Sequence, residues 1–192
     1  TSPWPHAAFL YHGKNGNQYF FRMIEYKYGE FHPPVDLINY VGEGLMVHAW
    51  QFMHGWDQQN TMDAAFIDKE RLLVTYLTSD YQRPASLDGA VEAFIYQEGA
   101  VEQHGIISGI QDFETGYTAN GAGSGVARIC TDHAGNAIVT SQEHETIPPN
   151  NMTSKIEFWR SKAVYFNGTS FEEQQVVGDD VFAMYPHCLF FE

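Results

Sequence analysis

The chain has 192 residues, of which 44% are hydrophobic and 15% aromatic, and its formal net charge is −14. This length and composition fit one folded domain with a sizeable core and exclude a disordered chain, and no apolar run approaches the roughly 20 residues that span a bilayer. Because 24 acidic residues face only 10 basic ones, the chain repels phosphate backbones and anionic lipid, so we expect no nucleic-acid partner and no membrane partner.

Short β-type runs separated by turn residues occupy the first part of the chain. In chain order, we predict strands over 7–12, 18–27 and 45–54. The two prolines Pro33 and Pro34 exclude a central strand, and glycines follow them, so we predict a loop over 29–44 that is long enough to act as a lid.

The same pattern continues to the end of the sequence. Further strands are predicted over 63–68, 71–77, 90–97, 104–110, 125–131, 136–142, 156–161, 162–168 and 181–191. The runs 156–161 and 162–168 form either a hairpin or one bulged strand, and the best helical candidate, 62–73, is long enough for one or two turns. We find no internal repeat and no linker, so a single domain over 1–192 is expected.

The spacing of these strands indicates an all-β protein. Few strands have one polar and one apolar face, which favours a single antiparallel β-barrel of roughly 8–10 strands, calycin-like in outline. A two-sheet β-sandwich is the alternative. The segment TSDY (78–81) is similar to the second conserved segment of the lipocalins, but no tryptophan has glycine two positions before it, as their first strand requires. The chain is therefore not assigned to that family.

Cys130 and Cys188 are the only cysteines. An even pair predicts one disulfide in a secreted protein, and the alternative is two buried thiols in a cytosolic one. Glycosylation sequons begin at Asn151 and Asn167, and the chain opens at Thr1 without an initiator Met, which we interpret as a processed or engineered start. These features together predict a secreted glycoprotein with one disulfide.

The segment LMVHAWQFMH (45–54) predicts an aromatic wall. Alternate residues of a strand share a face, which here carries Met46, His48, Trp50, Phe52 and His54. Six strand residues span about 20 Å, so the two histidines cannot bind one metal ion, and no metal-binding or cofactor motif is present elsewhere. We therefore expect neither metal nor cofactor. The alternative is that each histidine packs in the core or ends the strand.

Charged residues inside two other predicted strands lie among aromatic ones. Arg22 shares its face with Phe20, Ile24 and Tyr26, and Glu92 shares its face with Phe94 and Tyr96. If these faces point inward, an Arg22–Glu92 pair could bind a polar group of a ligand or act as acid and electrostatic stabiliser. If they point outward, the charges lie in water with aromatic neighbours.

We predict a secreted protein that binds a small, partly apolar organic molecule in an aromatic and histidine-lined cavity, either as a carrier or as a cofactor-free isomerase, cyclase or lyase. The catalytic candidates are His48, His54, Arg22 and Glu92, and the ligand-binding candidates are Trp50, Phe52, Phe20, Tyr26, Phe94 and Tyr96. The alternative is an extracellular carbohydrate-binding module whose exposed aromatics, for example Trp56, Tyr81 or Tyr117, stack on sugars. A third hypothesis is an extracellular structural protein without a ligand. The sequence does not define an oligomeric state.

Overall fold

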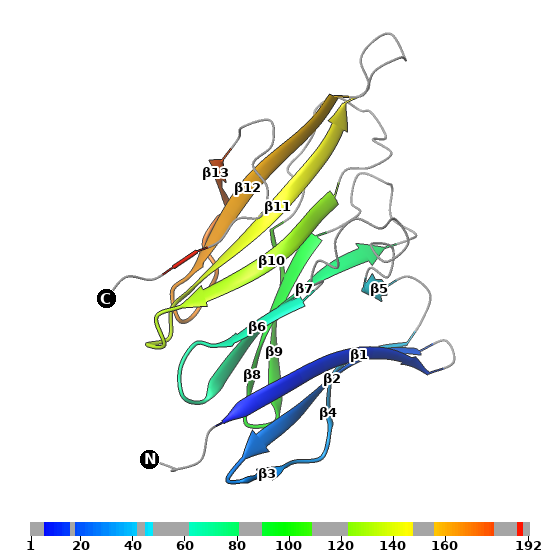
Figure 1. Ribbon diagram of the computed structural model, residues 1–192, viewed down its shortest axis with the longest axis vertical. Helices are drawn as coiled ribbons and strands as arrows, with labels where there is room; N and C mark the ends of the chain where they lie inside the picture. Colours follow the sequence, from blue (N-terminus) through cyan, green and yellow to red (C-terminus); the bar gives the residue numbers. More distant parts are fainter. Residues whose placement is uncertain are drawn as a thin grey trace. The chain divides into compact units, whose positions relative to one another are not determined.

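The computed structural model describes residues 6–15, 18–41, 45–47, 62–80, 90–108, 123–147, 156–178 and 188–189. In these ranges every regular element is a strand (Figure 1), so none of them contains a helix that could cross a membrane. The chain divides into two compact units, Thr1–Leu45 and Met46–Glu192. The single domain expected over 1–192 stays a prediction.

Unit 1 (Thr1–Leu45) is built around one antiparallel sheet. Its strands are β1 (Ala7–Asn15), β2 (Gln18–Lys27), β3 (Glu30–Phe31) and β4 (Val35–Val41). The central strand β2 pairs with β1 along its length, and with β3 and β4 in succession. Tyr28 and Gly29 join β2 to β3 with φ values of 57° and 88°, as a two-residue hairpin with a right-handed twist requires.

The loop predicted over 29–44 is wrong in its middle part, which forms β3 and β4. Pro33 and Pro34 lie between these two strands, where a missing N–H removes no ladder hydrogen bond. Among the described strands β4 pairs only with β2, so the prolines precede an edge strand and not a central one.

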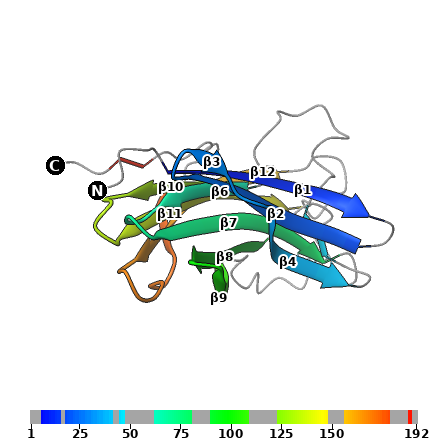
Figure 2. The same cartoon turned by 90° about the horizontal axis from the view of Figure 1, so that it is seen from below.

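Unit 2 (Met46–Glu192) contains two sheets. The strands, of which β5 begins at the unit boundary, are β5 (Leu45–Val47), β6 (Met62–Phe66), β7 (Arg71–Asp80), β8 (Ala90–Gln97), β9 (Ala100–Ser108), β10 (Gly123–Thr131), β11 (Ala137–Ile147), β12 (Ile156–Phe166) and β13 (Gln175–Gly178). One sheet has the order β5-β7-β8-β9, with β6 also pairing β7, and the other has the order β10-β11-β12-β13. In Figure 2, β7 runs across the view while β9 is seen nearly end-on, which shows how strongly the first sheet twists.

The hydrophobic core of unit 2 draws on strands of both sheets. Its buried members are Ile67, Leu73, Val91, Ala93, Ile95, Ile107, Ala127, Ala137, Val139 and Phe166. The other face of β7 and β8, which includes Tyr76 and Phe94, is also buried. A strand buried on both faces reads as a continuous apolar run, which explains why the sequence shows so few strands with a polar side.

The predicted closed barrel is wrong for the described residues, because they form three separate antiparallel sheets and the sandwich alternative is closer. The helical candidate 62–73 is also wrong. The Asp68 carboxylate accepts hydrogen bonds from the backbone N–H groups of Glu70 and Arg71, which turns the chain from β6 into β7.

The last part of the chain differs from the prediction in three details. The runs 156–161 and 162–168 form one strand, β12, whose pairing with β13 shifts register between Ser161 and Lys162. Strand β13 itself was not predicted. Of the strand expected over 181–191, only 188–189 lie within the described residues, and they belong to no strand.

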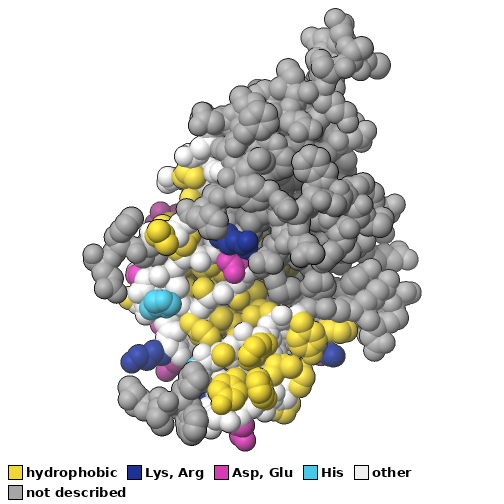
Figure 3. Space-filling view, viewed as in Figure 1, with side chains coloured by type: hydrophobic (Ala, Val, Ile, Leu, Met, Phe, Trp, Pro, Cys, Tyr) yellow, Lys and Arg dark blue, Asp and Glu magenta, His cyan; other side chains and the backbone are white. Residues whose placement is uncertain are grey.

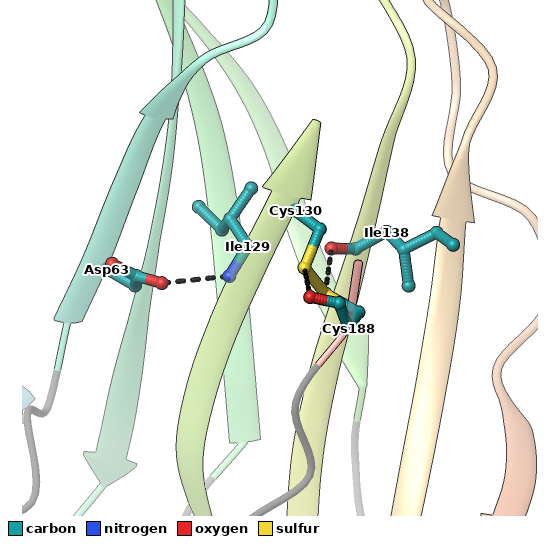
Figure 4. The surroundings of a disulfide bond; sticks show 5 residues. All are labelled: Asp63, Ile129, Cys130, Ile138 and Cys188. Atoms are coloured by element: carbon teal, nitrogen blue, oxygen red, sulfur yellow. Dashed lines mark hydrogen bonds between the residues drawn. A yellow bond between two sulfur atoms is a disulfide. The ribbon is translucent and has the colours of Figure 1, made fainter. Parts of the chain in front are cut away.

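The predicted disulfide is confirmed: Cys130 of β10 is bonded to Cys188 (Figure 4), with 5.7 Å between their Cα atoms. This bond ties residue 188 to β10, the outer strand of the second sheet, beside Ile138 of β11. On the other side of β10, the Asp63 carboxylate of β6 accepts a hydrogen bond of 2.8 Å from the backbone N–H of Ile129. The half-buried Asp63 carboxylate therefore links the two sheets of unit 2.

Candidate functional site

One face of the unit 1 sheet is lined by aromatic side chains around one ion pair. Residues that are paired directly across antiparallel strands point to the same face, and so do alternate residues along each strand. The register of β1, β3 and β4 against β2 therefore gathers side chains from all four strands on one side. We call this set the aromatic face: Phe9, Tyr11, Phe20, Arg22, Ile24, Tyr26, Phe31 and Asp36.

The aromatic face is open to solvent. Phe31 is 65% exposed, Phe9 52% and Tyr11 36%, whereas Met23 and Leu37 of the same unit are buried. Figure 3 shows hydrophobic side chains gathered at the surface over β1. Each large apolar side chain left in water forgoes about 1.5–3 kcal/mol of burial free energy, so a contiguous group of them marks an interaction site.

The rings of the aromatic face support one another in two clusters. In the first, the Phe31 ring centroid lies 5.0 Å from Tyr26 and 5.7 Å from Phe9, with tilts of 58° and 54°. In the second, Tyr11 meets Phe20 edge to face at 6.2 Å. Such tilted and edge contacts contribute about 0.5–1.5 kcal/mol each and hold the rings in position relative to one another.

Arg22 lies between the rings and the edge strand β4. Its Cζ is 4.2 Å from the Phe20 ring centroid, and its Nε donates a hydrogen bond to Oδ1 of Asp36. This hydrogen bond is the main reason that the pKa of Arg22 is raised above its ordinary value, against burial, which lowers it. Both side chains of the pair are 37% exposed, so a charged donor and a charged acceptor reach the surface together.

This arrangement has a definite chemical capacity. Ring faces attract C–H groups and exclude water from them, while a guanidinium and a carboxylate form strong hydrogen bonds with hydroxyl groups. A ligand that fits both has apolar C–H faces and a periphery of hydroxyls.

Three predicted site residues belong to the aromatic face. Phe20, Arg22 and Tyr26 lie on one side of β2, as alternation along the strand indicates. Their partners are Asp36 for Arg22 and the ring of Phe31 for Tyr26. These three residues therefore lie on one open face, where the sequence predicted an enclosed cavity, and their catalytic and ligand-binding roles stay predictions.

Three further predicted site residues, Glu92, Phe94 and Tyr96, lie on β8 of unit 2. Oε2 of Glu92 accepts a hydrogen bond of 2.8 Å from the Tyr76 hydroxyl. The Tyr76 ring lies 5.9 Å from that of Phe94, and both Phe94 and Tyr96 are buried. Catalysis by Glu92 and ligand binding by the two aromatics stay predictions.

Several predicted residues lie outside the described ranges: His48, Trp50, Phe52, His54, Trp56, Tyr81, Tyr117 and Asn151. The expected aromatic wall over 45–54 is thus represented only by β5. Its catalytic and ligand-binding roles stay predictions. Asn167 is described and lies exposed in the turn after β12.

Sequence reasoning missed Phe9, Tyr11, Phe31 and Asp36. The alternation of Phe9 and Tyr11 in AAFLYH is a signal that could have found the first two. Phe31 and Asp36 had no such signal, because the segment that contains them was interpreted as a loop. Which residues lie beside them is set by the pairing of β3 and β4 with β2.

A histidine of unit 2 also escaped the sequence reasoning. The ring of His104 on β9 meets Phe166 and Phe171 edge to face at 5.7 and 5.3 Å. Its Nε2 is buried without a hydrogen-bond partner among the described residues, since the Glu102 carboxylate at 3.6 Å is too distant for a hydrogen bond. His104 is the extra residue of a β-bulge, which turns its ring toward these two phenylalanines.

Further polar side chains lie between the two sheets of unit 2. Ser108 Oγ lies 3.0 Å from Ser141 Oγ and 3.0 Å from Gln174 Oε1, and Lys162, which pairs with Ser141 across β11 and β12, is only 1% exposed. This buried network links the two sheets and the segment before β13. Within the described ranges, no group of three or more His, Cys, Asp or Glu side chains is placed to hold a metal ion.

A scan against protein-family models, a search of curated proteins and a search of solved structures found no match to this chain.

Proposed function

We propose that the chain is a secreted carbohydrate-binding protein and that the aromatic face of unit 1 is its saccharide-binding site. The observation that carries this proposal is the group of the exposed Phe9, Tyr11 and Phe31 rings and the half-buried Phe20 ring beside the Arg22–Asp36 pair. The C–H faces of a pyranose ring stack on such rings, and its hydroxyl groups bond to the guanidinium and the carboxylate.

The polar pair favours a saccharide over a purely apolar ligand. Covering Arg22 and Asp36 with a hydrocarbon surface removes both charges from water without replacing their hydration, which costs free energy. Hydroxyl groups replace the lost water directly, because each one both donates and accepts. An open sheet face encloses little of its ligand, so we expect weak binding, with a Kd on the order of 0.1–1 mM for a short oligosaccharide.

Secretion is part of this proposal, since structural polysaccharides lie outside the cell. The disulfide between Cys130 and Cys188 supports it, because such bonds persist in oxidising compartments and are rare in the cytosol.

The test is binding to soluble polysaccharides, measured by affinity electrophoresis and titration calorimetry. Tyr11→Ala and Phe31→Ala remove rings from the aromatic face, and we expect each to raise Kd about tenfold, equivalent to about 1.4 kcal/mol. Tyr165→Ala is the matched control, because Tyr165 of β12 is 36% exposed like Tyr11 but belongs to unit 2. Equal binding by all four proteins, or no binding by any, contradicts the proposal.

The same variants test an alternative, in which a second copy of the chain binds to the aromatic face. Sedimentation velocity over a range of concentrations measures self-association. A dimer of the wild-type protein that Phe31→Ala converts to a monomer, without saccharide binding, would replace the saccharide with a protein partner.

Small-molecule binding in unit 2 is the second candidate function. It is supported by the acid–base pair of Tyr76 and Glu92 beside the Phe94 ring, in a region where aromatic side chains are buried. Native mass spectrometry of protein from its own source tests it. A retained organic mass that Glu92→Gln abolishes would favour this function, and a bare mass would favour the saccharide site.

A further inference from the structure

We infer that the aromatic face selects neutral saccharides and rejects uronate-containing or sulfated ones. This inference rests on the proposed function and adds the chemical class of the ligand. It follows from the pairing of the Arg22 charge with the Asp36 carboxylate.

The aromatic face carries no net charge. Its only charged side chains are Arg22 and Asp36, which are hydrogen-bonded to each other. The neighbouring residues Lys27 and Glu30 pair across β2 and β3 one position further on, so they point to the opposite side of the sheet. An anionic ligand therefore meets a guanidinium that already has a carboxylate partner.

An anionic group that binds here would have to interact with Arg22 at the same time as Asp36 does. A second carboxylate beside Asp36 places two like charges within a few ångströms, which is unfavourable unless one of them moves or takes up a proton. A hydroxyl group makes no such demand, because it donates to Asp36 and accepts from Arg22 at the same time. The pair thus distinguishes ligands by charge.

The charge of the whole chain acts in the same direction. A net charge of −14 repels a polyanion over the Debye length, which is about 8 Å at physiological ionic strength. A neutral polysaccharide does not experience this repulsion, so its binding should depend little on salt.

The experiment compares soluble polymers of the two classes. Neutral hydroxyethylcellulose, laminarin and galactomannan are titrated against polygalacturonate and chondroitin sulfate, with the full chain, at low and high NaCl concentration. We expect at least one neutral polymer to bind with a Kd about tenfold or more below that of either anionic polymer, and with little change on adding salt.

Two variants isolate the role of the ion pair. Asp36→Asn leaves the charge of Arg22 uncompensated, and we expect it to bind polygalacturonate about threefold to tenfold more tightly than the wild type, in a salt-dependent manner. Glu30→Gln is the control, because it removes the same charge from the same unit but on the opposite side of the sheet. We expect no such gain from it.

The outcomes separate this inference from the proposed function. Tighter binding of an anionic polymer by the wild type, reduced by Tyr11→Ala, would overturn the neutral preference and keep the saccharide site. An equal gain with Asp36→Asn and Glu30→Gln, or no gain with either, would overturn the role of the pair. Absence of binding to every polymer would overturn the proposed function itself.

Discussion

Nη1 of Arg71 donates a hydrogen bond of 2.7 Å to the carbonyl oxygen of Gly168, which lies 97 residues later in the chain. Nε of the same guanidinium donates to Asp68 at 2.6 Å, and Nη2 lies against Gly135. The turns that follow β6, β10 and β12 therefore meet at one side chain. Each turn is organised by a carboxylate or amide oxygen that accepts backbone N–H groups: Asp68, Asp132 and Asn167.

We predict that Gly135→Ala destabilises unit 2 more than Gly99→Ala does. Both glycines have positive φ, 110° and 86°, so alanine is strained at either site. A Cβ at Gly135 would in addition lie 2.9 Å from Nη2 of Arg71, whereas Gly99 has open space around it. We expect an excess of about 1–3 kcal/mol in the free energy of unfolding, measured by urea denaturation.

The double variant Arg71→Ala/Gly135→Ala provides the control for this mechanism. If the crowding of Arg71 causes the excess, the two substitutions cost less together than the sum of their separate costs. Strict additivity would show that the backbone strain at Gly135 is the whole effect.

Acidification should weaken the turn after β10. A side-chain hydrogen bond from Asn136 is the main reason that the pKa of Asp132 lies below its ordinary value; burial opposes it, and the N–H groups of Ala134 and Asn136 add to it. A depressed folded-state pKa contributes stability above the unfolded-state pKa of about 3.9, and this stability is lost as pH falls through the folded-state value.

The corresponding variant is Asp132→Asn. We expect it to lower the urea midpoint at pH 7 and to have a smaller effect at pH 3, because pH 3 lies below the unfolded-state pKa and part of this stabilisation is already lost there. Glu30→Gln controls for the loss of one negative charge elsewhere. A larger effect of Asp132→Asn at pH 3 than at pH 7 would show that the carboxylate does not stabilise this turn.

Removal of the disulfide should destabilise unit 2 markedly. Cys130 and Cys188 are 58 residues apart, so in the chain-entropy model their bond stabilises the fold by about 4 kcal/mol. Cys130→Ser/Cys188→Ser and the reduced wild-type protein should show the same loss in urea denaturation. A loss below about 1 kcal/mol in both would mean that residue 188 is held mainly by other contacts.

Truncation of an exposed ring of the aromatic face should affect stability far less than truncation of a buried side chain in the same unit. We expect Phe31→Ala to cost about 1 kcal/mol, the low end for its contacts with Phe9 and Tyr26, because the ring is mostly in water. Met23→Ala, at a fully buried position of β2, should cost about 2–5 kcal/mol. Circular dichroism during urea denaturation compares them. A similar large cost for both would identify Phe31 as a structural residue.

Asn167 should carry a glycan when the chain passes through a eukaryotic secretory pathway. It is exposed, and its Oδ1 accepts hydrogen bonds from the backbone N–H groups of Thr169 and Ser170. Thr169→Ala removes the sequon but keeps these backbone donors, so the turn is retained. Intact mass before and after glycan release should show the loss of one glycan in Thr169→Ala; an unchanged mass would mean that Asn167 is unmodified.

Local patterns in the sequence determined several features of this protein. The aromatic run QYFFRMIEYK predicted β2 with its bounds, the even cysteine pair predicted the Cys130–Cys188 bond, and alternation placed Phe20, Arg22 and Tyr26 on one face. Each of these depends on neighbouring residues or on residue count, which a single sequence contains.

Only the tertiary structure decided the rest. Alternation shows which side chains share a face but not whether that face meets water, so the sequence left open whether the face of Phe20, Arg22 and Tyr26 lines a cavity or lies at the surface. Whether strands close into a barrel or form separate sheets depends on pairing between distant segments, and the partner of Arg22 depends on the register of β4 against β2. These are long-range choices, set by the burial of whole faces and by hydrogen-bond pairing between strands, and no short stretch of residues encodes them.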